Sequence, residues 1–250
     1  MTHDIQKAGL WKRIAAGVLD GILLAVLAVG VAFLLGAFFG YDGYNTTLNE
    51  SYAYYEEQYG ISFYDEYQTL SPQEQAAYDE AYDALIQDEE AMKAYNMVLN
   101  LSLLITTVGL LGACLALEFA VPMILGNGQT IGKKVFGLGV IRVDGVRTTP
   151  VQLFVRTVLG KFTIEIMIPV YVVLMIFFNV TGLGGTLLLG ALLVAQILIM
   201  ALNSNTALIQ DLLAGTVVVD VASQMIFRDT QDLIDYKKKL SREQSSRQTY

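Results

Sequence analysis

The sequence predicts an all-α integral membrane protein with four transmembrane helices arranged as two hairpins, and three observations support this. Apolar residues make up 54% of the 250-residue chain and charged residues only 16%, whereas an average soluble domain has about 25% charged residues. Three long apolar runs, residues 14–39, 97–125 and 162–202, each exceed the roughly 20 residues that a bilayer-crossing helix needs. Basic residues gather before the first run, between the second and third runs and after the third, which predicts that both termini are cytoplasmic.

The N-terminal segment 1–40 is predicted to contain the first span. Asp20 is the only charged residue in the run 14–39. Lys7, Lys12 and Arg13 precede the run, as bases precede the apolar core of a signal peptide. However, the run is too long for such a core and no A-x-A-like cleavage site follows it. We therefore expect a helix that is retained.

The segment 41–96 is predicted to be a mostly helical, extracytoplasmic insert. Thirteen acidic residues lie in it and Lys93 is its only base. Ser71-Pro72-Gln73-Glu74 supplies a helix cap, a first-turn proline and an N3 glutamate, and one helix is expected to run from near Pro72 straight into the second span. The many tyrosines favour a packed unit over a disordered one. The acidic run fits either a solvated helix face or a surface that binds a protein or a cation.

The second span is predicted at residues 97–125, and a basic cytoplasmic loop at 126–161 follows it. Within this loop, residues 138–143 followed by Asp144-Gly145 predict a short β-hairpin, since Asp-Gly suits a tight turn with positive φ. A helix containing Arg156 is expected after Pro150. The glycine-rich stretch 126–133 lacks the spacing of a phosphate-binding loop, so we expect a tight turn there, with Lys133 and Lys134 as candidate contacts for lipid headgroups.

The run 162–202 is predicted to form the third and fourth spans. A single helix of 41 residues would be about 60 Å long, about twice the hydrocarbon thickness, and residues 181–185 (TGLGG) offer a turn. A re-entrant hairpin is the alternative. The cytoplasmic C-terminal segment 203–250 is expected to hold a short strand at 214–221 and a charged surface helix from about residue 224.

Charged residues inside the apolar runs are candidate functional residues, because an ionised side chain in the bilayer costs several kcal/mol unless it is paired or hydrated. Asp20 and Glu118 are the two such carboxylates that we single out. Arg13 lies seven residues before Asp20, too far along the helix for a simple direct pair, so we expect Asp20 to pair with Arg156. A structural role in fixing helix packing is the alternative for both carboxylates. The glycines at positions 17 and 21 form a GxxxG pattern that allows a homodimer through the first span.

Several classes of site are not expected. Cys114 and His3 are the only residues of their types, so an intramolecular disulfide, a histidine-based metal site and a catalytic triad within one chain are excluded. No cofactor and no nucleic acid is expected, and the protein is not expected to be an enzyme.

Several short motifs in order along the chain resemble the RDD family of membrane proteins, which is named for one arginine and two aspartates. Arg13 stands in Trp11-Lys12-Arg13 at the head of the first span, and Asp20 follows seven residues later. Residues 128–138 (GQTIGKKVFGL) resemble the family's loop after the second span, and Val143-Asp144-Gly145 its hairpin. Arg156 matches an arginine before the third span, and Asp211 in residues 210–219 (QDLLAGTVVV) matches the second aspartate.

The resemblance implies a multi-pass protein of a bacterial cell membrane whose role is transport, including cation/proton exchange, or the assembly of other membrane proteins. Two departures stand out: the insert 41–96 is unusually large, and Gln210 stands where members often have a histidine before the second aspartate. Two hypotheses therefore stay open. One is a small transporter that uses a buried carboxylate, with Arg13, Asp20, Glu118, Arg156 and Asp211 as its candidate residues. The other is a non-transporting scaffold that binds a partner through the acidic insert.

Overall fold

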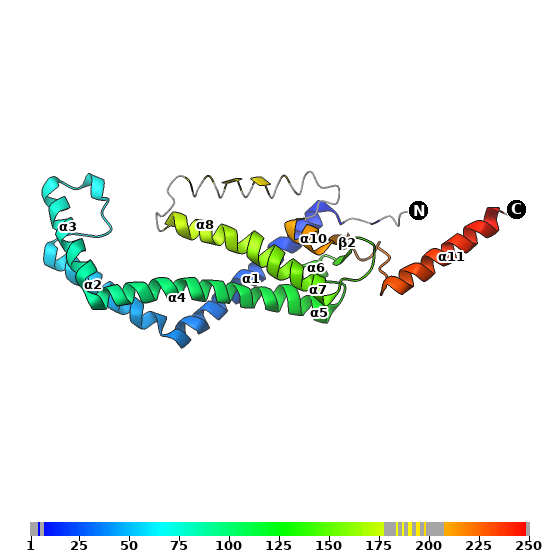
Figure 1. Cartoon of the computed structure of the whole chain (residues 1–250), viewed down its shortest axis with the longest axis horizontal. Helices are drawn as coiled ribbons and strands as arrows, with labels where there is room; N and C mark the ends of the chain where they lie inside the picture. The colour runs from blue at the N-terminus through cyan, green and yellow to red at the C-terminus, as the bar shows by residue number, and fades with distance from the viewer. Residues whose placement is uncertain are drawn as a thin grey trace. The chain divides into compact units, whose positions relative to one another are not determined.

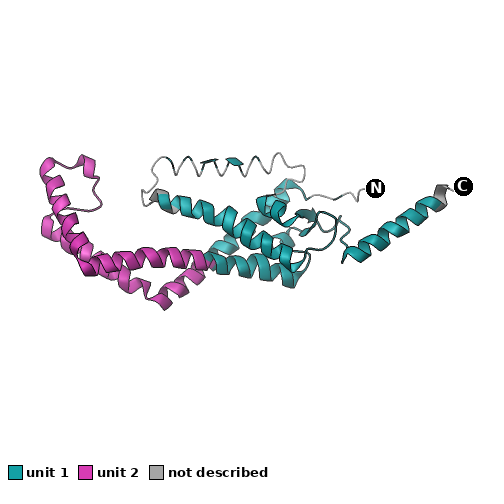
Figure 2. Cartoon of the chain, in the orientation of Figure 1, with its two compact units in different colours: residues 1–27, 110–250 teal, residues 28–109 magenta. Residues whose placement is uncertain are grey.

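The computed structural model describes residues 5, 8–177 and 208–248, with the single positions 184, 187, 190, 191, 194, 195 and 198 between them. The described chain is mostly helical and has one two-stranded sheet (Figure 1). It divides into two compact units (Figure 2). Unit 1 contains Met1–Leu27 and Leu110–Tyr250, and unit 2 contains Ala28–Gly109.

Two helices are long and apolar enough to cross a bilayer. The first is α1 (Leu10–Phe39), and the second is the helix Glu89–Leu125, which consists of α4 (Glu89–Cys114), η2 (Leu115–Ala120) and α5 (Val121–Leu125). At 30 and 37 residues, both exceed the length that the hydrocarbon core requires. Large apolar side chains of α1 stay exposed, for example Val29 at 69% and Phe33 at 75%. A surface of this kind fits contact with lipid better than contact with water.

In unit 2, the insert consists mainly of two helices joined by a short loop. These are α2 (Tyr41–Tyr59) and α3 (Pro72–Gln87), with the short η1 (Tyr67–Thr69) between them. Phe63 and Tyr78 stack edge to face at 5.5 Å between ring centroids, and the side chains of Ala81 and Leu85 in α3 are buried. These helices agree with the prediction that the segment 41–96 is mostly helical.

The helix that begins at Pro72 does not continue into the second span, so that prediction was wrong. The expected start is confirmed: Ser71 and Glu74 form a reciprocal capping box. The helix ends at Asp88, whose backbone is extended with φ −76° and ψ 109°. The Asp88 Oδ1 atom accepts hydrogen bonds from the backbone N–H groups of Glu90 (2.9 Å) and Ala91 (3.1 Å), and thereby caps the start of α4.

The two strands of unit 1 come from distant parts of the chain. β1 (Leu138–Arg142) pairs antiparallel with β2 (Thr216–Asp220), with Leu138 opposite Asp220 and Arg142 opposite Thr216. The predicted Asp144-Gly145 turn forms, with Gly145 N–H donating to the Arg142 carbonyl (3.0 Å). The return strand of the predicted hairpin, however, is only a single bridge between Ile141 and Arg147, so the expected hairpin is corrected to a sheet whose main pairing is with β2.

One face of this sheet packs against the start of α1. Leu138, Val140 and Val218 form an apolar cluster with Ala8 and Ala16. The short helix α6 (Ile131–Val135) immediately precedes β1, so the same packing holds α6 beside Ala16.

A long helical region follows Pro150, as predicted. It consists of α7 (Pro150–Phe154), η3 (Val155–Met167) and α8 (Ile168–Phe177). Beyond it, α10 (Ile209–Ala214) packs against η3, and α11 (Thr230–Gln248) forms the expected C-terminal helix. The predicted pair of spans at 162–202 and its re-entrant alternative lie mostly outside the described residues.

Candidate functional site

Unit 1 buries several charged side chains that the sequence had singled out. Asp20, Glu118, Arg156 and Asp211 are at most 4% exposed. Burying a charge is costly unless it is paired and hydrogen-bonded, so the partners of these groups decide what the site can do.

The Asp20 carboxylate is held at the start of α6. Its Oδ2 atom accepts from the Thr130 hydroxyl at 2.5 Å, and its Oδ1 atom accepts from the Gly132 backbone N–H at 2.7 Å. The Lys133 ammonium lies 3.5 Å from Oδ2. A Cβ atom at Gly132 would overlap the Ala16 carbonyl and lie 2.9 Å from the Asp20 carboxylate. Only glycine therefore lets α6 approach α1 this closely.

The Asp211 carboxylate lies between two arginines. Arg156 donates from Nε to Oδ1 at 2.9 Å, and Arg13 Nη2 lies 3.8 Å from Oδ2. The Thr216 hydroxyl also donates to Oδ1, at 3.2 Å. Although burial alone would lower the pKa of Arg156, attraction to Asp211 and Glu118 raises it. The guanidinium therefore stays charged, and so holds Asp211 in place.

These contacts correct the expected pairing of Asp20 with Arg156. Arg156 pairs with Asp211, and Asp20 pairs with Lys133. Spacing along one helix tells which residues share its face, but the partner depends on how the chain between residues 126 and 137 folds back onto α1. Arg13, Arg156 and Asp211, three of the residues that carried the family resemblance, do converge on one ion-pair cluster.

The third buried carboxylate, Glu118, lies on the widened π-helical turn η2. Its Oε1 atom forms an ion pair with the Lys161 ammonium, and its backbone carbonyl accepts from the Thr157 hydroxyl at 2.8 Å. Both partners belong to η3, which is also π-helical. Such wide turns occur frequently at functional sites, and here they join two helices through charged and polar contacts.

A fourth carboxylate, Glu165, differs from the other three. It accepts from the Gln210 backbone N–H at 3.1 Å and from Gln210 Nε2 at 2.9 Å. Among the described residues it has no cation within salt-bridge distance. Glu165 was not among the predicted site residues, although a carboxylate four residues after Lys161 in an otherwise apolar stretch was the available signal. Gly160 allows this contact, because a Cβ there would lie 2.5 Å from the Gln210 Cα atom.

A small cavity of about 90 Å³ lies among these groups. Its charged lining consists of Asp20 and Asp211 with four basic residues, and Gln210 lines it as well. The four basic residues are Arg13, Lys133, Arg156 and Lys161. A polar space of this size has room for a few water molecules. The cavity is therefore a candidate position for water or a small ion between α1, η3 and α10.

The two lysines predicted to contact lipid headgroups face different ways. Lys133 points inward, with 11% of its side chain exposed, and pairs with Asp20; that prediction is corrected. Burial lowers the pKa of the Lys133 ammonium, an effect that Glu118 opposes and Arg156 and Lys161 reinforce. Lys134 is exposed, so its predicted role remains a prediction.

The two glycines of the GxxxG pattern in α1 face open space. A Cβ at Gly17 or Gly21 would meet no described atom within 4 Å. The homodimer predicted through this face remains a prediction. Nowhere in the described ranges do three or more His, Cys, Asp or Glu side chains gather into a metal-binding group.

Two long apolar helices with exposed apolar faces, together with a buried cluster of ion pairs, are features of an α-helical membrane protein. The chain belongs to the RDD family, whose family model matches residues 7–215. This match includes Arg13, Asp20, Arg156 and Asp211. No curated protein and no solved structure matches the chain at a significant level of similarity.

Proposed function

We propose that this RDD-family protein is a small multi-pass carrier in a bacterial cell membrane, where it exchanges a small cation for a proton. Four spans, cytoplasmic termini and an outward-facing insert are part of the proposal, and the distribution of bases in the sequence supports them. The proposal involves no catalytic step and no cofactor.

The observation that carries this proposal is the polar cavity that is lined by Asp20, Asp211 and Gln210, the last of which donates a hydrogen bond to Glu165. Asp20, Asp211 and Glu118 each form an ion pair with a lysine or arginine side chain. These three pairs hold α6, α10 and η3 in position. Groups that are locked in this way are poor candidates for releasing and rebinding a proton, so Asp20 is better described as a positioning residue.

Glu165 is the carboxylate best suited to exchange a proton. Its partner Gln210 is a neutral amide that can satisfy either form of the acid. The amide N–H donates to the ionised carboxylate, as it does here at 2.9 Å. The buried Gln210 Oε1 atom has no hydrogen-bond donor among the described residues, and a protonated Glu165 could donate to it once the amide rotates.

The balance of charge gives a reason for exchange rather than simple binding. When all are ionised, the carboxylates of Asp20, Glu118, Glu165 and Asp211 match the four bases that line the cavity. A proton on Glu165 leaves one positive charge in excess, which disfavours a metal cation nearby. The loss of that proton removes the excess, so the proton and the cation compete for the same site.

The test is cation-driven proton flux in proteoliposomes that contain a pH-sensitive dye, with Na⁺ and K⁺ gradients applied in turn. We expect flux from the intact protein and at least a tenfold loss in Glu165→Gln. Glu165→Asp should retain part of the flux with a shifted pH profile. Glu80→Gln, an exposed acid of α3, is the matched control and should behave as the intact protein does. The absence of flux from the intact protein would reject the carrier; normal flux in Glu165→Gln would reject Glu165 as the coupling group.

A non-transporting scaffold is the second candidate function. The density of ion pairs around Asp20, Glu118 and Asp211 supports it, since such pairs also fix the packing of helices. Under this alternative the acidic insert binds a partner, and the intact protein shows no flux with either cation.

A further inference from the structure

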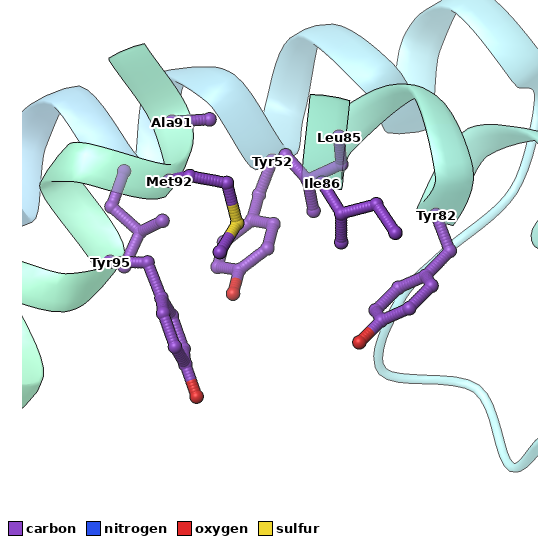
Figure 3. Close-up of a pocket in the computed structure, with 8 residues that line it drawn as sticks. Tyr52, Tyr82, Leu85, Ile86, Ala91, Met92 and Tyr95 are labelled. Carbon is purple, nitrogen blue, oxygen red and sulfur yellow. The ribbon is translucent and has the colours of Figure 1, made fainter. Parts of the chain in front are cut away.

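An aromatic groove in unit 2 lies outside the proposed carrier site. Each of three helices contributes one tyrosine to it: Tyr52 from α2, Tyr82 from α3 and Tyr95 from α4 (Figure 3). The buried side chains of Leu48 (7% exposed) and Leu85 (5%) also line it. The groove has a volume of about 260 Å³.

The rings of the groove remain accessible from solution. Tyr82 is 51% exposed and Tyr95 is 39% exposed. Figure 3 shows the three phenol rings projecting to the same side, with the Met92 side chain between Tyr95 and Tyr52. Tyr52 and Tyr82 also border a second hollow, which Phe63, Tyr64 and Tyr78 line. The aromatic surface thus continues past the groove itself.

The electrostatic surroundings of the groove are strongly negative. Thirteen acidic residues and a single base, Lys93, lie between residues 41 and 96. Burial and the neighbouring phenols raise the pKa of Tyr52, so its ring stays neutral and its π-face stays electron-rich. A field of one sign over an apolar hollow concentrates ligands of the opposite charge. Carboxylate and phosphate ligands are repelled from it.

We propose that this groove binds a soluble organic cation that carries a quaternary ammonium group. The faces of aromatic rings attract such a cation, and tyrosine cages are an established means of recognising it. Its methyl groups can pack against Leu85 and Met92, while the net negative charge of the segment 41–96 attracts its positive charge. An inorganic cation fits less well, because no carboxylate is among the residues that line the groove.

Isothermal titration calorimetry on the purified full-length protein in a non-ionic detergent tests this proposal. The probe is choline, and the control ligand is its neutral isostere with carbon in place of the ammonium nitrogen. Cation–π attraction worth about 1–2 kcal/mol predicts that choline binds roughly five- to thirtyfold more tightly than the isostere. Equal affinity for both ligands, or no heat with choline, would overturn the proposal.

A pair of substitutions at Tyr82 separates the π-face from simple apolar contact. Tyr82→Phe keeps the ring and should stay within about twofold of the intact protein, whereas Tyr82→Leu should weaken choline binding roughly fivefold. Since Tyr82 is half exposed, both variants should keep the melting temperature of the intact protein. Unchanged binding in a folded Tyr82→Leu variant, or binding of an oligolysine peptide without any binding of choline, would contradict a quaternary ammonium site.

Discussion

At the scale of single residues, the main feature of this protein is that its buried carboxylates are each fixed in a different way. Asp20 is held by a hydroxyl, a backbone N–H and an ammonium group. Asp211 is held by two arginines and a threonine. Glu165 is held only by Gln210, which donates hydrogen bonds from its backbone N–H and from its side-chain amide. Because a buried carboxylate exchanges protons more readily when no cation fixes it, these differences support the proposal that Asp20 and Asp211 hold the helices in position and that Glu165 exchanges the proton.

The sequence singled out four of the buried charged residues, but it missed Glu165 and did not predict how the charged groups pair. A carboxylate in an apolar run is conspicuous because it is costly there, which is how Asp20 and Glu118 were found. The partners of Asp20, by contrast, include Thr130 and Gly132 in the glycine-rich stretch after the second span. That they meet Asp20 depends on the path of the loop and on Gly132 fitting against Ala16, and neither is visible in a pattern of residue types.

The pair of Arg156 with Asp211 gives a prediction at this scale. Asp211→Asn removes the charge that compensates Arg156, which is 3% exposed, and breaking a buried pair in this way costs about 3–5 kcal/mol. The free energy of unfolding in mild detergent should fall by that amount. The double variant Asp211→Asn/Arg156→Gln should recover part of the loss, because it removes the more deeply buried of the two arginines that would otherwise face a neutral amide.

The pair of Arg142 with Asp144 is the matched control for this measurement. It is close, at 2.6 Å, but each side chain is about a third exposed. Asp144→Asn should therefore cost at most about 1 kcal/mol. Equal losses in Asp144→Asn and Asp211→Asn would show that burial does not set the strength of the Asp211 pair.

At the scale of secondary structure, helix caps account for several boundaries that were predicted and one that was missed. The Ser71–Glu74 capping box was recognised from its spacing, and a second box of the same kind joins Thr149 and Gln152 at the start of α7. The break at Asp88 was missed because the residues around it are good helix formers with no Gly or Pro. Only the side chain of Asp88, which accepts from the N–H groups of Glu90 and Ala91 in the first turn of α4, reveals the new start.

The first of these boxes should depend on pH. Hydrogen bonds from Ser71 lower the pKa of Glu74 below its usual value, which is about 4.3 in unfolded chains. A lowered pKa in the folded state means that the box stabilises α3 fully above about pH 4.3, and that this contribution is lost as pH falls through the lower, folded pKa. Amide hydrogen exchange over residues 72–76, corrected for intrinsic rates, should therefore accelerate below about pH 4.

The box at Thr149 and Gln152 is an internal control, because glutamine carries no titrating proton. Exchange over residues 150–154 should not change in the same pH range. Glu74→Gln, which keeps the hydrogen-bonding geometry of the box, should remove the pH dependence from α3. Acceleration at both boxes together would indicate a general loss of structure rather than titration of Glu74.

At the scale of the whole chain, composition predicted more than motifs did. The two apolar runs at 14–39 and 97–125 became the two long apolar helices, since length and hydropathy alone determine that property. The small sheet was harder to predict. Its two strands are separated by about 75 residues of sequence. The sequence alone therefore predicted that β1 pairs with the residues just after it, in a hairpin, and not with the distant β2.

The distribution of charge along the chain gives the last prediction, which concerns the sides of the membrane. The bases lie before α1, in the loop after α5 and in the C-terminal tail, whereas the insert is acidic. If bases stay in the cytoplasm, the insert faces outward while the tail faces inward, which requires an odd number of spans between them. We expect a membrane-impermeant maleimide to label Gln68→Cys, an exposed position in the insert, on intact cells, and Ser241→Cys in α11 only after permeabilisation.

The native cysteine makes this labelling experiment simple to control. Cys114 is fully buried, so the protein without either substitution should stay unlabelled under both conditions. Introducing each substitution into a Cys114→Ala background eliminates labelling of the native cysteine. Labelling of both positions on intact cells would mean that the insert and the tail share a side, which is incompatible with a fourth span. Labelling of neither position until permeabilisation would place the acidic insert in the cytoplasm, and the groove of Tyr52, Tyr82 and Tyr95 would then meet cytoplasmic rather than external cations.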